Sequence, residues 1–168
     1  MNLMEKKMVE LLRELKEKYS VTGVKAEFEA EGTRIEEAMR LKEISMKAGV
    51  DMTIKVGGCE DIKDMLDCAS LGTNHVVGPM VETAYALKKY IGAVKTAFDS
   101  EQRSDMEFLI NVETITTIKN LDAMLAIPEA ADLGGVVVGR VDLTGSMGLN
   151  RESVNQKEVL DLALEVAR

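Results

Sequence analysis

The sequence is poor in aromatic residues and contains no tryptophan. Three Phe and three Tyr are spread over 168 residues, so no aromatic platform for stacking bases is visible. The net charge of −8 also leaves no basic face for a phosphate backbone. We therefore expect no nucleic-acid partner.

Long apolar runs and a secretory signal are missing as well. The longest apolar stretches are too short to span a bilayer, and the N-terminus, MNLMEKKMVELL, has the pattern of a charged amphipathic helix. The two cysteines, Cys59 and Cys68, have a spacing that fits no metal knuckle or redox motif. We interpret them as free thiols and expect a cytoplasmic protein without a membrane partner.

No Gly/Ser linker or low-complexity segment divides the chain, so residues 1–168 are expected to form a single domain, or part of a larger one. Helical and strand patterns alternate along it. The expected helices are 3–18, 34–48, 60–71, 82–98, 115–126 and 156–167. The expected strands are 21–28, 52–56, 75–78, 108–112 and 136–139. This order predicts five β/α units around a parallel sheet, preceded by an N-terminal helix.

Two architectures have this order: an open doubly wound sheet and a (β/α)₈ barrel. The length favours the open sheet, because a full barrel takes about 250 residues. The strand faces favour the barrel, because polar residues recur at every second position toward the strand ends, where a barrel opens to solvent. These residues are Lys25, Glu27 and Glu29, then Thr53 and Lys55, then Asn111 and Glu113, and finally Arg140 and Asp142.

We therefore predict a partial TIM barrel in the α/β class, truncated or split, or an unusual small relative of the complete fold. A missing wall would expose apolar strand edges. The expected partner is a complementing barrel segment or a second copy in a homo-oligomer.

Two apolar runs end in carboxylates. Phe108-Leu-Ile-Asn-Val-Glu113 and Val136-Val-Val-Gly-Arg-Val-Asp142 would place Glu113 and Asp142 at the same end of neighbouring parallel strands. Two hard oxygen ligands with open positions would suit Mg²⁺ or Mn²⁺. The alternative is that both residues cap helices.

A glycine-rich segment surrounds the second carboxylate. Gly139-Arg-Val-Asp-Leu-Thr-Gly-Ser-Met-Gly148 contains three glycines and two hydroxyl residues. As a loop it could turn backbone N–H groups toward an anionic substrate, or it could simply need glycine conformations.

Three motifs in order resemble the aldolase/citrate lyase family of metal-dependent (class II) pyruvate aldolases, which includes 2-dehydro-3-deoxyglucarate aldolase-like enzymes. They are Pro79-Met-Val-Glu-Thr83, Asn111-Val-Glu-Thr114 and the 139–148 segment, each at the C-terminal end of an expected strand. The resemblance implies a (β/α)₈ barrel in which Glu113 and Asp142 bind a divalent metal. It also implies that the metal chelates a 2-oxo acid or acyl-CoA-type substrate and stabilises the enolate formed when a carbon–carbon bond breaks.

The same resemblance implies further roles. The family holds its substrate with an Arg at the end of an early strand, where this chain has Lys55, which keeps the charge without the bidentate fork. Arg140 and Gly139 are the other expected substrate contacts.

The family's Asp-x-Glu-His run is replaced by Glu27-Phe-Glu-Ala-Glu31, so Glu27 or Glu29 would act as base, directly or through a metal-bound water. His75, the only histidine, starts a strand at the opposite end and is expected to be structural.

Three functions remain open from the sequence. The leading hypothesis is a metal-dependent carbon–carbon lyase. A Schiff-base aldolase would instead use Lys55 or Lys25 as its amine. A non-catalytic barrel fragment would bind a small acid or assemble with a partner.

Overall fold

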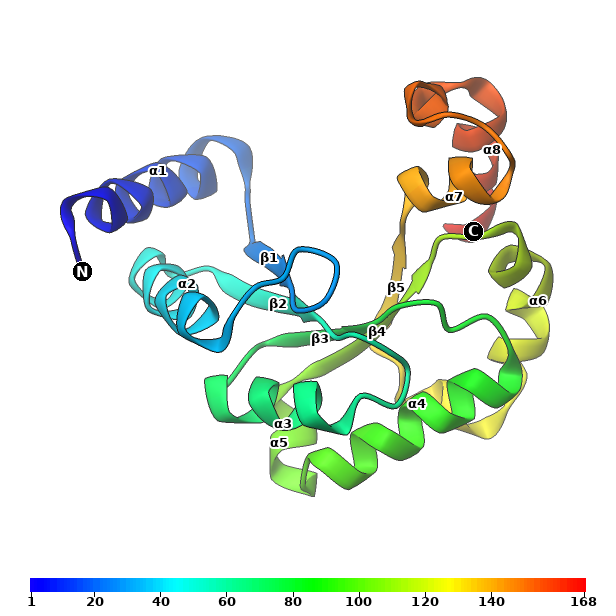
Figure 1. The fold of residues 1–168 in the computed structure, drawn as a ribbon, viewed down its shortest axis with the longest axis horizontal. Helices are drawn as coiled ribbons and strands as arrows, with labels where there is room; N and C mark the ends of the chain where they lie inside the picture. Colours follow the sequence, from blue (N-terminus) through cyan, green and yellow to red (C-terminus); the bar gives the residue numbers. More distant parts are fainter.

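The structure is a computed structural model that describes residues 1–168. Five parallel strands form one sheet in the order β1-β2-β3-β4-β5, so each strand pairs with its neighbour in the sequence. The strands are β1 (Gly23–Glu27), β2 (Asp51–Lys55), β3 (His75–Gly78), β4 (Glu107–Val112) and β5 (Gly135–Val138). The sheet curves, and the chain forms part of a (β/α)₈ barrel (Figure 1).

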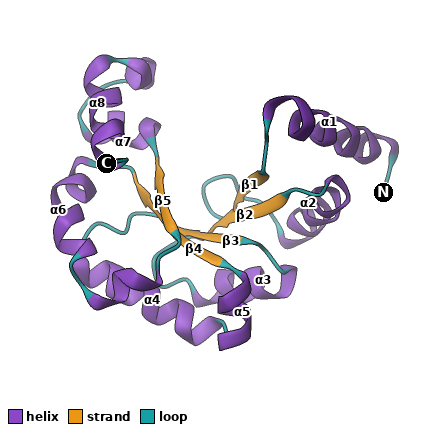
Figure 2. Ribbon diagram, turned by 180° about the vertical axis from the view of Figure 1, so that it is seen from behind, coloured by secondary structure: helices purple, strands orange, loops and turns teal.

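The helices lie around the outside of the curved sheet (Figure 2). They are α1 (Leu3–Tyr19), α2 (Ile35–Ala48), α3 (Ile62–Leu71), α4 (Ala84–Ala97), α5 (Ser100–Asp105), α6 (Ile115–Leu125), α7 (Arg140–Ser146) and α8 (Lys157–Val166). Two 3₁₀ helices, η1 (Pro128–Asp132) and η2 (Arg151–Asn155), complete the chain. No helix is both long enough and apolar enough to cross a bilayer.

The five predicted strands and the N-terminal helix are confirmed. The prediction of a loop over residues 139–148 is wrong, because Arg140–Ser146 forms helix α7 and only the flanking residues are irregular. Arg140 and Asp142 therefore do not continue the alternation of a strand. Helix α5, which an Asp99–Gln102 capping box starts, was also not predicted.

The two faces of the sheet differ in polarity. The face toward the helices carries Met52, Ile54, Val76 and Ile110, which are completely buried. The alternate residues face the barrel interior, and among them are Lys25, Thr53, Lys55, His75 and Asn111. The polar alternation that predicted a barrel rather than an open sheet is thus present in the structure.

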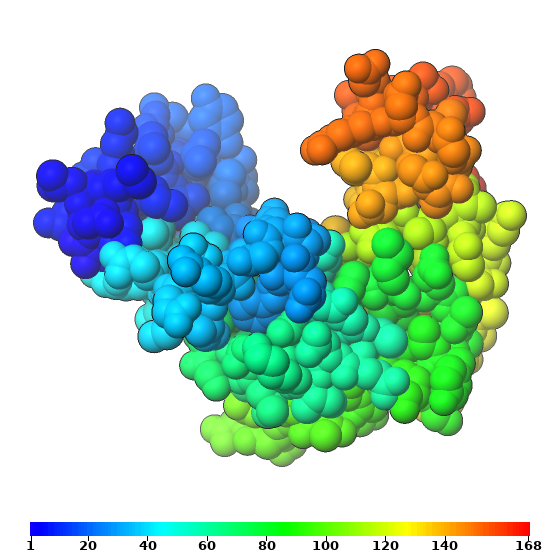
Figure 3. Space-filling view, viewed as in Figure 1, coloured from blue at the N-terminus to red at the C-terminus, as the bar shows by residue number.

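The barrel is open on one side. Figure 3 shows a wide gap between the N-terminal segments, in blue, and the C-terminal helices, in orange and red. Strands β1 and β5 lie at the two edges of the sheet, where each has only one neighbouring strand. The inner surface is therefore reachable through this gap.

Gly78, at the end of β3, allows the Tyr90 ring of α4 to approach the sheet. Tyr90 is completely buried, and its hydroxyl donates to the Val76 carbonyl oxygen at 3.0 Å. A Cβ at position 78 would lie 2.7 Å from Cε2 of this ring. Because the hydroxyl anchors the ring, the ring has little room to move away.

We predict that Gly78→Ala lowers the free energy of unfolding by about 1–3 kcal/mol, the usual cost of overpacking a core. Gly92→Ala is the matched control, since position 92 lies inside α4 with no atom within 4 Å of a new Cβ. That change should raise the stability by about 1 kcal/mol through helix propensity. Urea unfolding of both variants measures the effect, and a neutral Gly78→Ala would show that the ring is not held in place.

Candidate active site

Glu113 is the buried centre of the candidate site. It directly follows β4 and is only 2% exposed. Asn111 Nδ2 donates to its Oε2 at 2.7 Å, and the Met80 backbone N–H donates to its Oε1 at 3.4 Å. The helix-cap alternative does not hold for Glu113, because the N-cap of α6 is Thr114, whose Oγ1 accepts from Thr117 N–H.

Gly139 leaves the space that the Glu113 carboxylate occupies. Val112 pairs with Val138, and the Gly139 N–H donates to the Val112 carbonyl oxygen at 3.1 Å. A Cβ on Gly139 would lie 2.7 Å from Glu113 Cβ and 2.8 Å from its Oε2. The predicted substrate contact of Gly139 is untested, but its close approach to Glu113 is a structural requirement.

The electrostatic environment links Glu113 to Asp142, an exposed residue in the first turn of α7. Burial raises the pKa of Glu113, and the negative charge of Asp142 raises it further, against the Met80 hydrogen bond and the Lys55 charge. The structure therefore brings the two predicted metal ligands close enough for their charges to interact.

A lysine pair holds Glu27 on the inner face. Lys25 Nζ lies 2.5 Å from Glu27 Oε1, and Lys55 Nζ lies 2.8 Å from Oε2. Burial opposes the charge of Glu27, but hydrogen bonds from the two lysines hold the pKa of that carboxyl below its usual value. Burial likewise opposes the charge of Lys55, but Glu27, Glu113 and Asp142 raise the pKa of that amine. Lys55 is thus held as a cation by the carboxylates of Glu27, Glu113 and Asp142.

A pocket of about 240 Å³ lies beside Lys55. Glu29, Pro79 and Met80 line it with Lys55. Met80 has φ of +50°, a left-handed conformation that is uncommon for a side chain of its size, and its N–H is the group that reaches Glu113. The wall of the pocket and the buried carboxylate are therefore connected through one strained residue.

Glu29 also belongs to a second acidic cluster. Its carboxylate lies with those of Asp61 and Asp64, with one oxygen of each within 4.8 Å of the others. Asp64 is buried and accepts from the Gly57 N–H at 2.9 Å. Glu29 is exposed and lines the pocket, and it takes no part in the ion pairs of Glu27 with Lys25 and Lys55.

Two other residues lie away from this group. Arg140 Nη1 donates to the Val154 carbonyl oxygen at 3.2 Å and to Asn155 Oδ1 at 2.8 Å, so its guanidinium contacts η2.

His75 lies at the start of β3, where Nδ1 is 3.2 Å from Thr53 Oγ1 and Nε2 is 3.5 Å from Glu107 Oε2. The structure thus places His75 at the end of the sheet opposite Glu113, as expected.

The three motif segments are joined by hydrogen bonds. Thr114 Oγ1 donates to Glu82 Oε1 at 2.5 Å, which joins the segment after β4 to the one after β3. The Ile115 N–H donates to Ser146 Oγ at 3.0 Å, which joins it to α7. Motifs that lie about thirty residues apart in the chain thus form one connected unit around Glu113.

Asn111 and Met80 were assigned no role from the sequence, although both contact Glu113. The period-2 pattern placed Asn111 on the inner face, and this is the signal that could have identified it. Nothing in the sequence indicates the positive φ of Met80. Asn111 is 3% exposed, and its Oδ1 is buried without a hydrogen-bond partner.

The donor set at this position fits a hard divalent cation. Neither Glu113 nor Asp142 takes part in an ion pair with a basic side chain, and their charges repel. Asn111 Oδ1 adds an unused neutral oxygen nearby. Carboxylate oxygens without a basic partner, together with an amide oxygen, are the kind of ligands that Mg²⁺ and Mn²⁺ prefer.

We predict that Glu113→Gln makes the metal-free protein more stable at pH 7.5 than the wild type, and that the difference shrinks toward pH 4. The pKa of Glu113 is higher in the folded than in the unfolded protein. Its contribution to stability is therefore fully present below the pKa of the unfolded chain, and it is lost as the pH rises through the pKa of the folded protein. Urea unfolding in EDTA at both pH values measures this. Glu17→Gln, at an exposed position on α1, controls for the loss of one negative charge. Equal changes in the free energy of unfolding for both variants at both pH values would contradict the prediction.

Comparisons with known proteins identify a matching family and several structures with the same fold. The family model for HpcH/HpaI aldolase/citrate lyase matches residues 29–167. Among curated proteins, no sequence matches the chain significantly.

Several solved structures share the fold at low sequence identity. An HpcH/HpaI aldolase from Desulfitobacterium hafniense is 14% identical, with a TM-score of 0.73 over 94% of this chain and 67% of that one. An HpcH/HpaI aldolase/citrate lyase family protein from Burkholderia cenocepacia is 11% identical, with a TM-score of 0.73 over 96% and 70%. Citrate synthase SbnG is 14% identical, with a TM-score of 0.72 over 95% and 67%.

The chain thus spans about two thirds of the length of these structures. The family match covers most of the chain, and its three motifs surround one buried carboxylate at the strand ends. The chain therefore belongs to the HpcH/HpaI aldolase/citrate lyase family.

Proposed function

We propose that this chain acts as a metal-dependent carbon–carbon lyase on a 2-oxo acid or a related acid. Family membership supports an aldolase or citrate lyase type of function. The observation that carries the proposal is the buried Glu113 carboxylate, which forms no ion pair with a basic side chain and whose pKa is influenced by the charges of Asp142 and Lys55. Burying a carboxylate beside a second carboxylate costs free energy unless a cation binds between them. The Lys55 ammonium group nearby could in turn bind an anionic ligand.

In this proposal Glu113 and Asp142 hold Mg²⁺ or Mn²⁺. Mg²⁺ commonly takes one or two protein carboxylates and leaves other positions to water or substrate. When bound, the ion would supply Lewis-acid stabilisation of the negative charge that develops on the substrate oxygen. Asn111 orients Glu113 through its Nδ2, and Gly139 keeps the space for the carboxylate open.

Lys55 is proposed to bind the carboxylate of the substrate. Its ammonium group is 2.8 Å from Glu27 Oε2 and borders the pocket of about 240 Å³. Glu27 would act as a positioning residue, because both of its oxygens are engaged by lysines and its lowered pKa makes it a weak base. Glu29, which borders the same pocket without an ion pair, is then the better-placed base, directly or through a water molecule.

The substrate would be a small 2-oxo acid or an acyl-CoA-type compound, and the location the cytoplasm. The two free cysteines are consistent with a reducing compartment. A homo-oligomer or a complementing segment would cover the open edges at β1 and β5.

A non-catalytic barrel fragment is the second candidate, and the open side of the barrel favours it (Figure 3). In that case the inner face would bind a small acid without turning it over, or only after a partner closes the barrel. A Schiff-base mechanism is less favoured, since the raised pKa of Lys55 keeps its amine protonated and therefore not nucleophilic.

We predict that Glu113→Gln and Asp142→Asn each weaken Mn²⁺ binding by at least about 100-fold, because loss of an outer-shell partner alone commonly costs 10–100-fold. Isothermal titration calorimetry of the purified chain measures the affinity. The matched control is Glu29→Gln with Asp61→Asn, which removes two carboxylates from the other acidic cluster. If the control double variant lost Mn²⁺ binding while Glu113→Gln and Asp142→Asn bound normally, the metal site would instead be the cluster of Glu29, Asp61 and Asp64.

We also predict that Lys55→Met weakens pyruvate binding to the Mn²⁺-loaded protein by about 10–100-fold, the value of one hydrogen bond to a charged group. Lys25→Met is the control, because Lys25 pairs with the same Glu27 but its side chain is 40% exposed and it does not line the pocket. Equal losses in both variants would contradict a direct contact. Trapping of pyruvate on Lys55 by borohydride in EDTA would instead support the Schiff-base alternative.

A further inference from the structure

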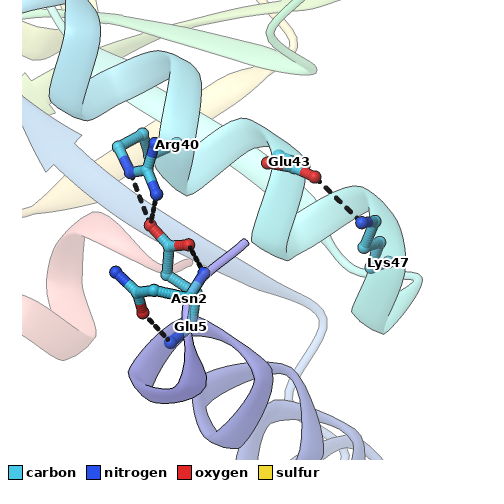
Figure 4. A network of polar contacts seen from close by, with 5 residues as sticks. All are labelled: Asn2, Glu5, Arg40, Glu43 and Lys47. Carbon is cyan, nitrogen blue, oxygen red and sulfur yellow. Dashed lines mark hydrogen bonds and ion pairs between the residues drawn. The ribbon is translucent and has the colours of Figure 1, made fainter.

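Helix α1 is fixed to the rest of the chain along one face. It packs chiefly against α2, with Val9 and Glu5 buried between them. Figure 4 shows the polar contacts: Asn2 and Glu5 form the capping box that begins α1, and Arg40 Nε donates to Glu5 Oε1 at 2.5 Å. Near the other end, Arg13 Nη2 donates to the Lys47 carbonyl oxygen at 2.6 Å. The orientation of α1 is thus set at both ends.

A second face of α1 is apolar but exposed. Met4, Met8, Leu11 and Leu15 are 73%, 38%, 48% and 40% exposed. Their separations of four, three and four residues place them in one stripe, with the spacing of a coiled-coil seam. Figure 3 shows α1, in dark blue, at the outer rim of the molecule, so a large partner can reach it.

We propose that this stripe pairs with the same stripe of a second copy of the chain, with the two α1 helices antiparallel. In the register that centres the pair between Met8 and Leu11, Met8 packs on Leu11 of the second copy and Met4 packs on Leu15 of the second copy. Each methionine then meets a leucine, and the twofold axis repeats every contact. The stripe is therefore complementary to itself without any rearrangement.

The charges beside the stripe match in the same register. Lys7 and Glu14 lie on one side of it, seven residues apart and both exposed. In the antiparallel pair, Lys7 of each copy lies next to Glu14 of the other, which gives two ion pairs. In a parallel pair, Lys7 would instead face Leu12 of the second copy, and no ion pair would form. Charge complementarity therefore selects the antiparallel arrangement.

The overall charge also favours contact at this helix. The chain has a net charge of −8, so two copies repel over most of their surfaces. α1 is different, because it carries five basic and four acidic side chains. A helix of this length is only about 26 Å long, so the buried area is small and the dimer is expected to dissociate in the micromolar range.

Charge reversal tests the pairing and its direction. Lys7→Glu places two like-charged pairs in the dimer, as does Glu14→Lys, so each variant alone should dimerise about tenfold more weakly than the wild type at low salt. Mixed together, the two variants should form a heterodimer about as tight as the wild-type dimer, because every pair then has opposite charges. Sedimentation equilibrium of the full chain measures all four samples.

The double variant Lys7→Glu with Glu14→Lys is the second measurement, and it should dimerise like the wild type. Both positions are exposed, so circular dichroism and thermal melting should show folded protein throughout. The proposal is overturned if the wild type is monomeric up to about 100 μM, or if neither single variant changes the dissociation constant. It is also overturned if the mixture dimerises no better than its components, as expected if another surface, or a complementing barrel segment, is the natural partner of α1.

Discussion

The burial of one carboxylate, that of Glu113, constrains the rest of the site. A charged group that is 2% exposed needs partners, and the chain provides few of them: an amide nitrogen of Asn111 and a long hydrogen bond from Met80. Space for it exists only because residue 139 has no side chain. With Asp142 nearby, the negative charges of the two carboxylates repel, and a divalent cation would relieve this repulsion.

The parallel sheet explains how this charge comes to lie beside Lys55 and the pocket. Strands β2, β3 and β4 end at the same edge, so the segments that follow them meet there. Hydrogen bonds from Thr114 to Glu82 and from Ile115 to Ser146 then connect the segments that follow β3, β4 and β5. The polar groups of the inner face thus form one site even though the barrel is open on one side (Figure 3).

Much of this arrangement could be predicted from the sequence. Periodicity located all five strands, because residues that alternate between a buried helix-facing side and a polar interior leave a clear pattern. The same alternation distinguished a barrel from an open sheet. The aligned ends of β4 and β5 then followed from parallel pairing, which made Glu113 and Asp142 a candidate pair.

Other features depend on tertiary contacts that no local pattern reports. The 139–148 segment reads as a loop because Gly145 and Gly148 are poor helix formers, yet α7 forms there, held to α6 by Ser146. Arg140 contacts η2 rather than the pocket, because its position in α7 sets its direction. The positive φ of Met80 and the second acidic cluster at Glu29 arise from how separate loops meet in space.

The most direct test of the central claim is the position of a bound metal ion. Crystals grown with Mn²⁺ and pyruvate should show an anomalous difference peak between the carboxylates of Glu113 and Asp142, with pyruvate extending toward Lys55. A peak at Glu29, Asp61 and Asp64, with none near Glu113, would contradict the account.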